Sequence, residues 1–215
     1  MTSTLMDPRV AAVLAAFDER AAREGELMRS LPTAEGMARR DEWLIHVGDA
    51  AGRLLNLLVR EAKATRILEL GTAYGYSTVW LAEAARATGG RVTSLEIHPG
   101  KQAQAREALT QAGLAEQVDF QLGDACSLLD GLDGPFDFVL IDLWKELYIP
   151  CFDRVWPKLA AGGFIAADNM RLPPVHIEDA ERYRAHVRST LSTHPGAGTV
   201  LLPVGSGIEL TRKDE

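Results

Sequence analysis

Four polar residues in the second half of the chain have side chains suited to holding a metal ion and moving a proton: Asp142, Lys145, Asp168 and Asn169. Asp142 follows the apolar run FDFVLI, and Asp168 and Asn169 follow the next such run, GFIAA. We expect these runs to be neighbouring parallel strands, whose carboxyl ends would bring the three oxygen-bearing side chains together. Carboxylate and amide oxygens in a partly hydrated site suit Mg²⁺, so we predict that Asp142, Asp168 and Asn169 bind it.

Lys145 lies three residues after Asp142, at the mouth of the same predicted site. The pKa of a lysine side chain is ordinarily about 10.4, and loss of solvent or a nearby positive charge lowers it toward that of a useful base. An ordinary surface lysine in a salt bridge is the alternative interpretation. Beside a divalent cation, we expect Lys145 to act as a general base in contact with a substrate.

The stretch ILELGTAYGYSTV, residues 67–79, predicts a buried strand, a turn with two glycines and the start of a helix. Gly71 and Gly75 would let the backbone approach a ligand closely, and Ser77 would cap a helix whose free amides attract a carboxylate. The same glycines would also serve a plain strand-to-helix turn. The turn lacks the middle glycine of the dinucleotide fingerprint G-x-G-x-x-G. This disfavours a dinucleotide and favours a ligand with a carboxylate and no phosphate, such as S-adenosylmethionine (SAM).

The next two predicted strands end in groups suited to an adenosine. One ends at Glu96, followed by Ile97, and an acidic side chain at such a position accepts hydrogen bonds from ribose hydroxyls. The other ends in LGDA, where Asp124 and Ala125 would meet the adenine edge. A strand-end glutamate alone would indicate little. Three strand ends in order, each with suitable chemistry, indicate an adenosine-type ligand.

The elements that must position these residues follow from the pattern of apolar runs. From residue 63 onward, short runs rich in β-branched residues alternate with helical stretches, which predicts a parallel sheet covered by helices on both faces. The last two runs, TVLLPV and GIELTR, flank a Gly-Ser-Gly turn at residues 205–207 and predict an antiparallel hairpin. Seven mostly parallel strands closed by such a hairpin form the Rossmann-like sheet of class I methyltransferases, whereas a plain Rossmann sheet ends differently.

The N-terminal part of the chain has a different pattern. Residues 7–62 are expected to be mostly helical, with a break at residues 31–33 and a second helix over residues 49–62. The spacing of Ala50, Leu54, Leu57 and Leu58 predicts that they share the apolar face of this second helix. A chain of 215 residues is most simply one domain. We expect a helical region over residues 1–62 and a cofactor-binding α/β core over residues 63–215.

The composition limits the partners of the chain. A formal net charge of −7 argues against duplex nucleic acid or an anionic membrane as the main partner, because both require basic patches. The apolar run at residues 10–17 is too short to span a bilayer. Cys126 and Cys151 form no C-x-x-C pair and are expected to be free thiols in a reducing cytoplasm. The five histidines are scattered and offer no zinc cluster.

Several segments resemble the Mg²⁺-dependent O-methyltransferases that use SAM, and within that family the catechol O-methyltransferases. The matching segments are EWLIHVGDAAGRLL (residues 42–55), ILELGTAYGYSTV (67–79), LEIHPG (95–100), FDFVLIDLWKELY (136–148) and ADNM (167–170). The D-x-W-K pattern at residues 142–145 is more specific than the D-A-D-K pattern that is commoner in the family.

The resemblance implies a role for each matching position. The metal ligands would be Asp142, Asp168 and Asn169, and the general base would be Lys145. The residues at the cofactor would be Val47, Glu69, Gly71, Gly75, Ser77, Glu96, Ile97, Asp124, Ala125 and Asp142, with Trp144 packing near the adenine. The substrate would meet Trp43 and Pro173 as apolar walls, together with Lys145 and Asn169. For Trp43, filling the core is the alternative.

The chain also departs from the family. Catechol O-methyltransferases place a glutamate near the second hydroxyl of the substrate, close to the C-terminal strands, but this chain has no acidic residue between Glu181 and Glu209. Ala73 and Leu143 stand where the animal enzyme has a tyrosine and a histidine. These departures concern the expected substrate, an aromatic vicinal diol, and leave the expected reaction unchanged.

The expected function is methylation of a hydroxyl of a small catechol-type molecule by a monomer or homodimer, with no nucleic-acid or membrane partner. Three alternatives remain open. One is a caffeoyl-CoA-type or metal-independent O-methyltransferase, although the chain has no obvious basic patch for a CoA group. Another is a SAM-binding protein without catalysis, which would have no use for the metal ligands and the lysine together. A third is an NAD-dependent oxidoreductase, which the glycine pattern disfavours.

Overall fold

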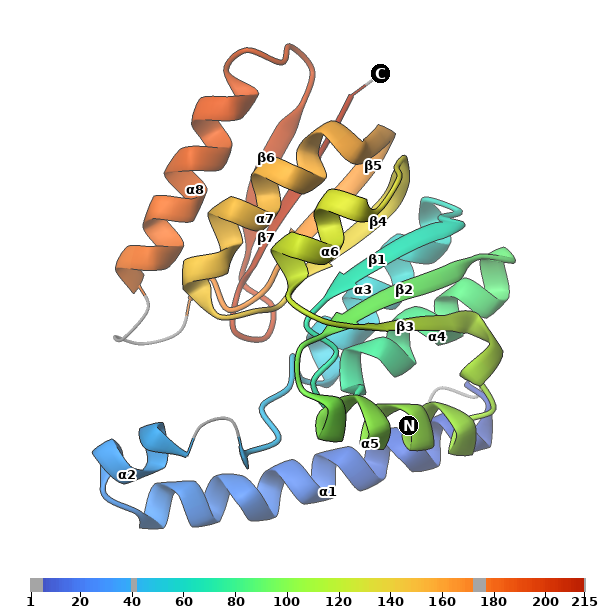
Figure 1. Cartoon of the computed structure of the whole chain (residues 1–215), viewed down its shortest axis with the longest axis vertical. Coiled ribbons are helices and arrows are strands. Elements are labelled where there is room, and N and C mark those ends of the chain that lie inside the picture. Colours follow the sequence, from blue (N-terminus) through green and yellow to red (C-terminus); the bar gives the residue numbers. More distant parts are fainter. Residues whose placement is uncertain (1–5, 40–41, 172–176, 215) are drawn as a thin grey trace.

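The structure, a computed structural model, describes residues 6–39, 42–171 and 177–214. Its centre is a seven-stranded sheet in the order β3-β2-β1-β4-β5-β7-β6 (Figure 1). The strands are β1 (Arg66–Leu70), β2 (Arg91–Glu96), β3 (Val118–Leu122), β4 (Phe136–Ile141), β5 (Leu159–Ala167), β6 (Gly198–Leu202) and β7 (Ile208–Arg212). The first five are parallel, and β7 runs antiparallel to both β5 and β6. The predicted parallel sheet with a closing hairpin is confirmed.

Of the eight α-helices in the described part of the chain, seven cover this sheet, and α2 (Thr33–Ala38) packs against α1 instead (Figure 1). The seven are α1 (Pro8–Ser30), α3 (Asp49–Glu61), α4 (Tyr76–Thr88), α5 (Pro99–Gln111), α6 (Ala125–Gly131), α7 (Tyr148–Val155) and α8 (Ile177–Leu191). They form two layers, with α1, α3, α4 and α5 on one face of the sheet and α6, α7 and α8 on the other (Figure 1). The break predicted at residues 31–33 lies at Leu31 and Pro32, which separate α1 from α2, whereas Thr33 already belongs to α2.

The central strands supply apolar side chains to both layers because successive side chains of a strand point to opposite faces. In β1, Ile67 packs with the helical layer of α1, α3, α4 and α5, and Leu68 packs with the layer of α6, α7 and α8. In β4, Phe138 and Val139 divide in the same way. This burial on both faces explains why these strands are almost continuously apolar.

The predicted apolar face of α3 is wrong at Ala50 and Leu57, which are exposed, whereas Leu54 and Leu58 are partly buried and pack against the core. Its buried face carries Ala51, Leu55, Val59 and the polar Asn56, whereas Leu57 is 59% exposed. The reason lies in α4, against which α3 packs. The amide of Asn56 donates to the main-chain oxygen of Trp80 at 2.9 Å and to the carboxylate of Glu83 at 2.6 Å. A buried amide with good partners is stable, and the apolar spacing alone does not reveal those partners.

Candidate active site

The predicted site residues gather at the carboxyl ends of the parallel strands, where open α/β sheets bind their ligands. A hollow of about 200 Å³ lies there, next to a smaller one of about 20 Å³. The larger hollow is lined by nine predicted residues: Trp43, Gly71, Glu96, Ile97, Asp124, Ala125, Asp142, Trp144 and Asn169. Val47 and Ser77 line the smaller one, and Gly71 and Asp142 line both.

The turn after β1 is fixed between the ends of its two neighbouring strands. The amides of Gly71 and Thr72 donate to the carbonyl of Leu95 in β2, at 3.0 and 3.1 Å. Gly71 has a φ of 99°, and a side chain here would overlap the main-chain oxygen of Asp142. Only glycine tolerates both conditions. Gly71 therefore allows the turn after β1 and the end of β4 to come into direct contact.

Gly75 has a packing role in the structure and lines neither hollow. It precedes α4 with a φ of 97°, and an added Cβ would lie 3.0 Å from the Cβ of Ala105 in α5. The glycine thus begins α4 and lets α5 pack closely beside it. The predicted role of Gly75 at the cofactor stays a prediction, because a glycine needed for packing and one needed for a ligand look the same in a sequence.

Glu69 lies beneath the turn and lines neither hollow, because its side chain is fully buried. Its two carboxylate oxygens accept hydrogen bonds of 2.6 Å from the hydroxyls of Ser77, Thr78 and Ser94. Burial raises the pKa of Glu69 to about 7, although these three hydroxyls favour the charged form. Glu69 therefore holds Ser77, which lines the smaller hollow, without lining either hollow itself.

Glu96 lines the larger hollow at the end of β2. One of its carboxylate oxygens accepts from the amide of Ala73 at 2.7 Å, and the other accepts from the amide of His98 at 2.8 Å. Each carboxylate oxygen has two acceptor positions, so Glu96 keeps capacity for hydroxyl donors in the hollow. Further along, Asp124 caps α6 by accepting from the amide of Cys126 at 3.1 Å.

The three predicted metal ligands come together where β4 and β5 end. The amide of Asp168 donates to the carbonyl of Ile141 at 3.1 Å, which holds the two strand ends side by side. Asp142 and Asn169 line the hollow. Asp168 is 1% exposed, and its Oδ1 atom has no hydrogen-bond partner among the described residues. Its Oδ2 atom accepts from the amide of Asn169 at 3.1 Å.

The electrostatics of this group fit a cation. Burial raises the pKa of Asp142 to about 6. Burial also raises the pKa of Asp168, to about 8, and the negative charge of the nearby Asp142 adds to this effect. A buried carboxylate with an unpartnered oxygen is costly unless a positive charge compensates it. No group of three or more His, Cys, Asp or Glu in the described part of the chain could hold a metal. The candidate set therefore consists of two carboxylates and the amide of Asn169, whose oxygen chemistry suits Mg²⁺.

Lys145 is buried beside these carboxylates. Its Nζ atom donates to the main-chain oxygen of Asp168 at 2.9 Å and lies 3.5 Å from the centre of the Tyr148 ring. Burial lowers the pKa of Lys145 to about 8, while the charges of Asp142 and Asp168 act in the opposite direction. Lys145 itself does not line the larger hollow. It is hydrogen-bonded to Asp168, which directly precedes Asn169, and Asn169 does line that hollow.

Tyr148 is a site residue that sequence reasoning missed. It is fully buried at the start of α7, and its hydroxyl donates to the same carbonyl of Asp168 at 3.1 Å. The available signal was its spacing: Tyr148 follows Lys145 by three residues in DLWKELY, and residues three apart on a helical turn are neighbours.

The candidate substrate side of the hollow is apolar. The indole nitrogen of Trp43 donates to the carbonyl of Gly36 at 3.1 Å, which fixes the ring in the wall. Ile45, 54% exposed, lines the hollow near it. Pro173, the other predicted substrate wall, lies outside the described residues. Glu209 is buried in an ion pair with Arg184 at 2.8 Å and does not line the hollow, so it does not replace the missing substrate-side glutamate.

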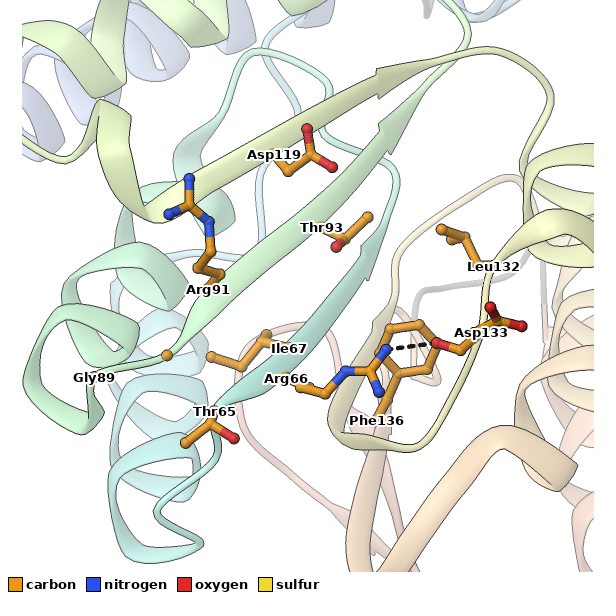
Figure 2. Close-up of a pocket in the computed structure, with 11 residues that line it drawn as sticks. Thr65, Arg66, Ile67, Gly89, Arg91, Thr93, Asp119, Leu132, Asp133 and Phe136 are labelled. Atoms are coloured by element: carbon orange, nitrogen blue, oxygen red, sulfur yellow. Dashed lines mark hydrogen bonds between the residues drawn. The ribbon is translucent and has the colours of Figure 1, made fainter.

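A third hollow, of about 600 Å³, lies at the opposite, amino ends of β1, β2 and β4 (Figure 2). Figure 2 shows the guanidinium of Arg66 directed to the main chain of Asp133, to which it donates at 2.6 Å. A second bond of 2.9 Å joins Arg66 to the carbonyl of Gly134. This hollow contains none of the predicted catalytic, cofactor or metal residues. The candidate active site is therefore the hollow at the carboxyl ends.

Comparison with known proteins agrees with this geometry. A sequence profile described as O-methyltransferase matches residues 18–214. This chain belongs to the O-methyltransferase family. A catechol O-methyltransferase of Mycobacterium tuberculosis is 35% identical over 213 residues, which cover 95% of this chain and 87% of the relative. A caffeoyl-CoA O-methyltransferase of Eucalyptus globulus is 28% identical over 89% of this chain and 83% of its own length.

A solved O-methyltransferase of Bacillus cereus in complex with SAH has a TM-score of 0.72 and 25% identity, covering 99% of this chain and 94% of its own. The fold is that of the SAM-dependent class I methyltransferases, so the hollow at the carboxyl ends belongs to a SAM-dependent O-methyltransferase. No helix of this O-methyltransferase, within the ranges that the structure describes, has both the length and the apolar character needed to cross a bilayer.

Proposed function

We propose that this O-methyltransferase transfers the methyl group of SAM to one hydroxyl of an aromatic vicinal diol, with Mg²⁺ as the metal and Lys145 as the base. One observation carries the proposal: a buried lysine and a buried carboxylate oxygen without a partner meet at Asp168, beside the hollow that most of the predicted cofactor residues line. The extensive match to a catechol O-methyltransferase supports the same substrate class.

Different residues of the chain would bind the metal, bind the cofactor and exclude water from the site. Asp142, Asp168 and Asn169 would hold Mg²⁺, which when bound acts as a Lewis acid on a diol hydroxyl. Glu96 would accept the ribose hydroxyls. The walls around Trp43 would exclude water from the reacting groups, which strengthens their electrostatic interactions.

Lys145 would take the proton of the reacting hydroxyl at its Nζ atom. A base must be neutral to accept a proton, and burial lowers the pKa of Lys145 to about 8, so part of the population is neutral near that pH. The substrate oxygen then forms a bond to the methyl carbon as the carbon–sulfur bond of SAM breaks. The products are a methyl ether and SAH. Since the attacking oxygen is negative and the sulfonium positive, the two charges cancel during the transfer, and positioning supplies much of the rate.

A caffeoyl-CoA ester is the competing substrate, because relatives with that name also match. The phosphates of CoA require cationic partners. Among the described residues that line the two hollows there is no arginine, and Lys101 is the one lysine. This lining favours a small diol.

The test is to incubate the protein with SAM and either a small catechol or caffeoyl-CoA, with and without Mg²⁺, and to analyse the products by mass spectrometry. We expect a mono-methylated catechol that forms only with a divalent cation. Methylation of caffeoyl-CoA alone would overturn the small-diol assignment, and full activity after metal removal would overturn the metal assignment. A protein that binds SAM but methylates neither substrate would overturn the proposal as a whole.

A further inference from the structure

The two cysteines of the chain, which form no C-x-x-C pair in the sequence, face each other in the structure. The sulfur atoms of Cys126 and Cys151 lie 3.9 Å apart, on α6 and α7 respectively. Both helices belong to the same layer on the sheet. The sulfurs are therefore neighbours although 25 positions separate the two residues.

We propose that Cys126 and Cys151 are a reversible oxidation site, at which a hydroperoxide converts the two thiols into a disulfide that weakens SAM binding. A disulfide needs a sulfur–sulfur distance of about 2.05 Å. The two sulfurs would have to approach by about 2 Å, which a rotation of one side chain combined with a small shift of a helix can supply.

The environments of the two thiols differ and set an order of reaction. Cys126 is half-buried and accessible to a small oxidant, whereas Cys151 is fully enclosed. Burial raises the pKa of the Cys151 thiol well above its ordinary value, which keeps it protonated and protects it from direct oxidation. Cys126 would react first, and Cys151, already in contact, would resolve the product.

The oxidation of the two thiols to a disulfide would take place in two steps. The Cys126 sulfur attacks the hydroperoxide, the oxygen–oxygen bond breaks, and Cys126 becomes a sulfenic acid while the peroxide is reduced to an alcohol, or to water in the case of hydrogen peroxide. The Cys151 sulfur then attacks the Cys126 sulfur, the sulfur–oxygen bond of the sulfenic acid breaks, and the proton of the Cys151 thiol passes to the departing hydroxide, which leaves as water. In total, two thiols lose two hydrogen atoms, and the peroxide accepts both electrons and both protons.

The position of the pair connects it to the active site. Cys126 directly follows Asp124 and Ala125, which line the larger hollow, and its amide donates to the Asp124 side chain. Cys151 lies in α7, the helix that begins at Tyr148, whose hydroxyl is bonded to Asp168. A disulfide would draw α6 and α7 together and shift the wall at Asp124 and Ala125. This consequence rests on the proposed cofactor site, whereas formation of the bond does not.

The experiment treats the reduced full-length protein with hydrogen peroxide, blocks remaining thiols, and maps peptides without reduction. We expect one intramolecular cross-linked peptide pair containing Cys126 and Cys151, with the mass of two hydrogen atoms lost. Titration calorimetry with SAM should then give a Kd raised about fivefold or more, the lower end of typical couplings between sites. Dithiothreitol should restore the original Kd.

Cys151→Ser and Cys126→Ser are the matched controls. Both variants should bind SAM with the Kd of the reduced wild type. Treatment with peroxide should not change the Kd of either variant beyond experimental error. Absence of the cross-linked peptide, or a cross-link between two chains, would overturn the proposed site. A cross-linked protein with an unchanged Kd would overturn the coupling to the cofactor. Because neither readout uses methyl transfer, both stand whether or not the catechol assignment holds.

Discussion

The ammonium nitrogen of Lys145 lies 3.5 Å from the centre of the Tyr148 ring, and both side chains donate to the main-chain oxygen of Asp168. The aromatic ring faces the charge and the shared carbonyl limits its movement, so Tyr148 restricts where Lys145 can lie. The proposed base and the residue that limits its movement are thus adjacent on one helical turn.

Tyr148→Phe keeps the ring and removes the hydroxyl. We expect kcat to fall roughly three- to tenfold, the effect of losing a hydrogen bond of about 1 kcal/mol, with an unchanged KM for SAM. Steady-state kinetics with a small catechol would measure it. Tyr183→Phe is the matched control, because the Tyr183 hydroxyl is equally buried but has no hydrogen-bond partner in the described structure. Equal losses of kcat in both variants would argue against a positioning role for Tyr148.

Lys145→Ala should lower kcat by roughly 10²–10⁴-fold, as loss of a general base does. The same variant should bind SAM with nearly the wild-type Kd, because Lys145 does not line the cofactor hollow. Single-turnover kinetics and titration calorimetry separate these two quantities. A Lys145→Ala protein that methylates catechol at the wild-type rate would refute the assignment of the base.

The strands of this fold could be predicted from sequence because each strand buried on both faces is a short apolar run bounded by polar residues. The ends of those runs also located Glu96, Asp124, Asp142 and Asp168, since a parallel sheet gathers its carboxyl ends at one edge. The features that could not be predicted from the sequence depend on contacts between helices. The buried face of α3 follows from the partners that Asn56 finds in α4, and the 3.9 Å approach of Cys126 and Cys151 follows from how α6 lies beside α7. Neither the buried face of α3 nor the approach of the two cysteines can be derived from the spacing of apolar residues.

The metal hypothesis predicts a difference in thermal stability between Asp168→Asn and the wild type. Mg²⁺ that binds the folded state should raise the Tm of the wild type as its concentration increases. Asp168→Asn removes a buried carboxylate whose Oδ1 atom has no partner, so the variant should be at least as stable without metal and should gain little from Mg²⁺. Thermal unfolding with EDTA and with a series of Mg²⁺ concentrations measures both effects. Equal Mg²⁺-dependent shifts in both proteins would contradict a ligand role for Asp168.

The raised pKa of Glu69 predicts that the stability of the protein depends on pH. This pKa is raised from 4.5 to about 7 by burial, so between these values the folded protein binds a proton that the unfolded chain has lost. The free energy of unfolding should therefore decrease as pH rises through this window, by up to about 1.4 kcal/mol per pH unit from this group. In Glu69→Gln this contribution disappears. Urea unfolding of both proteins at several pH values, with Mg²⁺ present, gives the difference, and parallel stability curves would refute the prediction.

Gly71→Ala should disturb the cofactor turn more than a glycine replacement at an equally left-handed position without a close neighbour. At Gly71, with a φ of 99°, the new methyl group would overlap the main-chain oxygen of Asp142. Backbone strain and overlap together should cost about 3 kcal/mol of stability or more. Because the displaced atom belongs to Asp142, SAM affinity and methyl transfer should fall as well.

Gly89→Ala is the control for that change. Gly89 also has a positive φ, of 73°, but an added Cβ would meet no atom within 4 Å. Its cost should be the backbone term alone, about 1–2 kcal/mol, with an unchanged Kd for SAM. Chemical unfolding and calorimetry on the two variants separate backbone strain from the contact with Asp142. If Gly71→Ala bound SAM as well as Gly89→Ala does, the close approach of the turn to the end of β4 would have no part in forming the cofactor site.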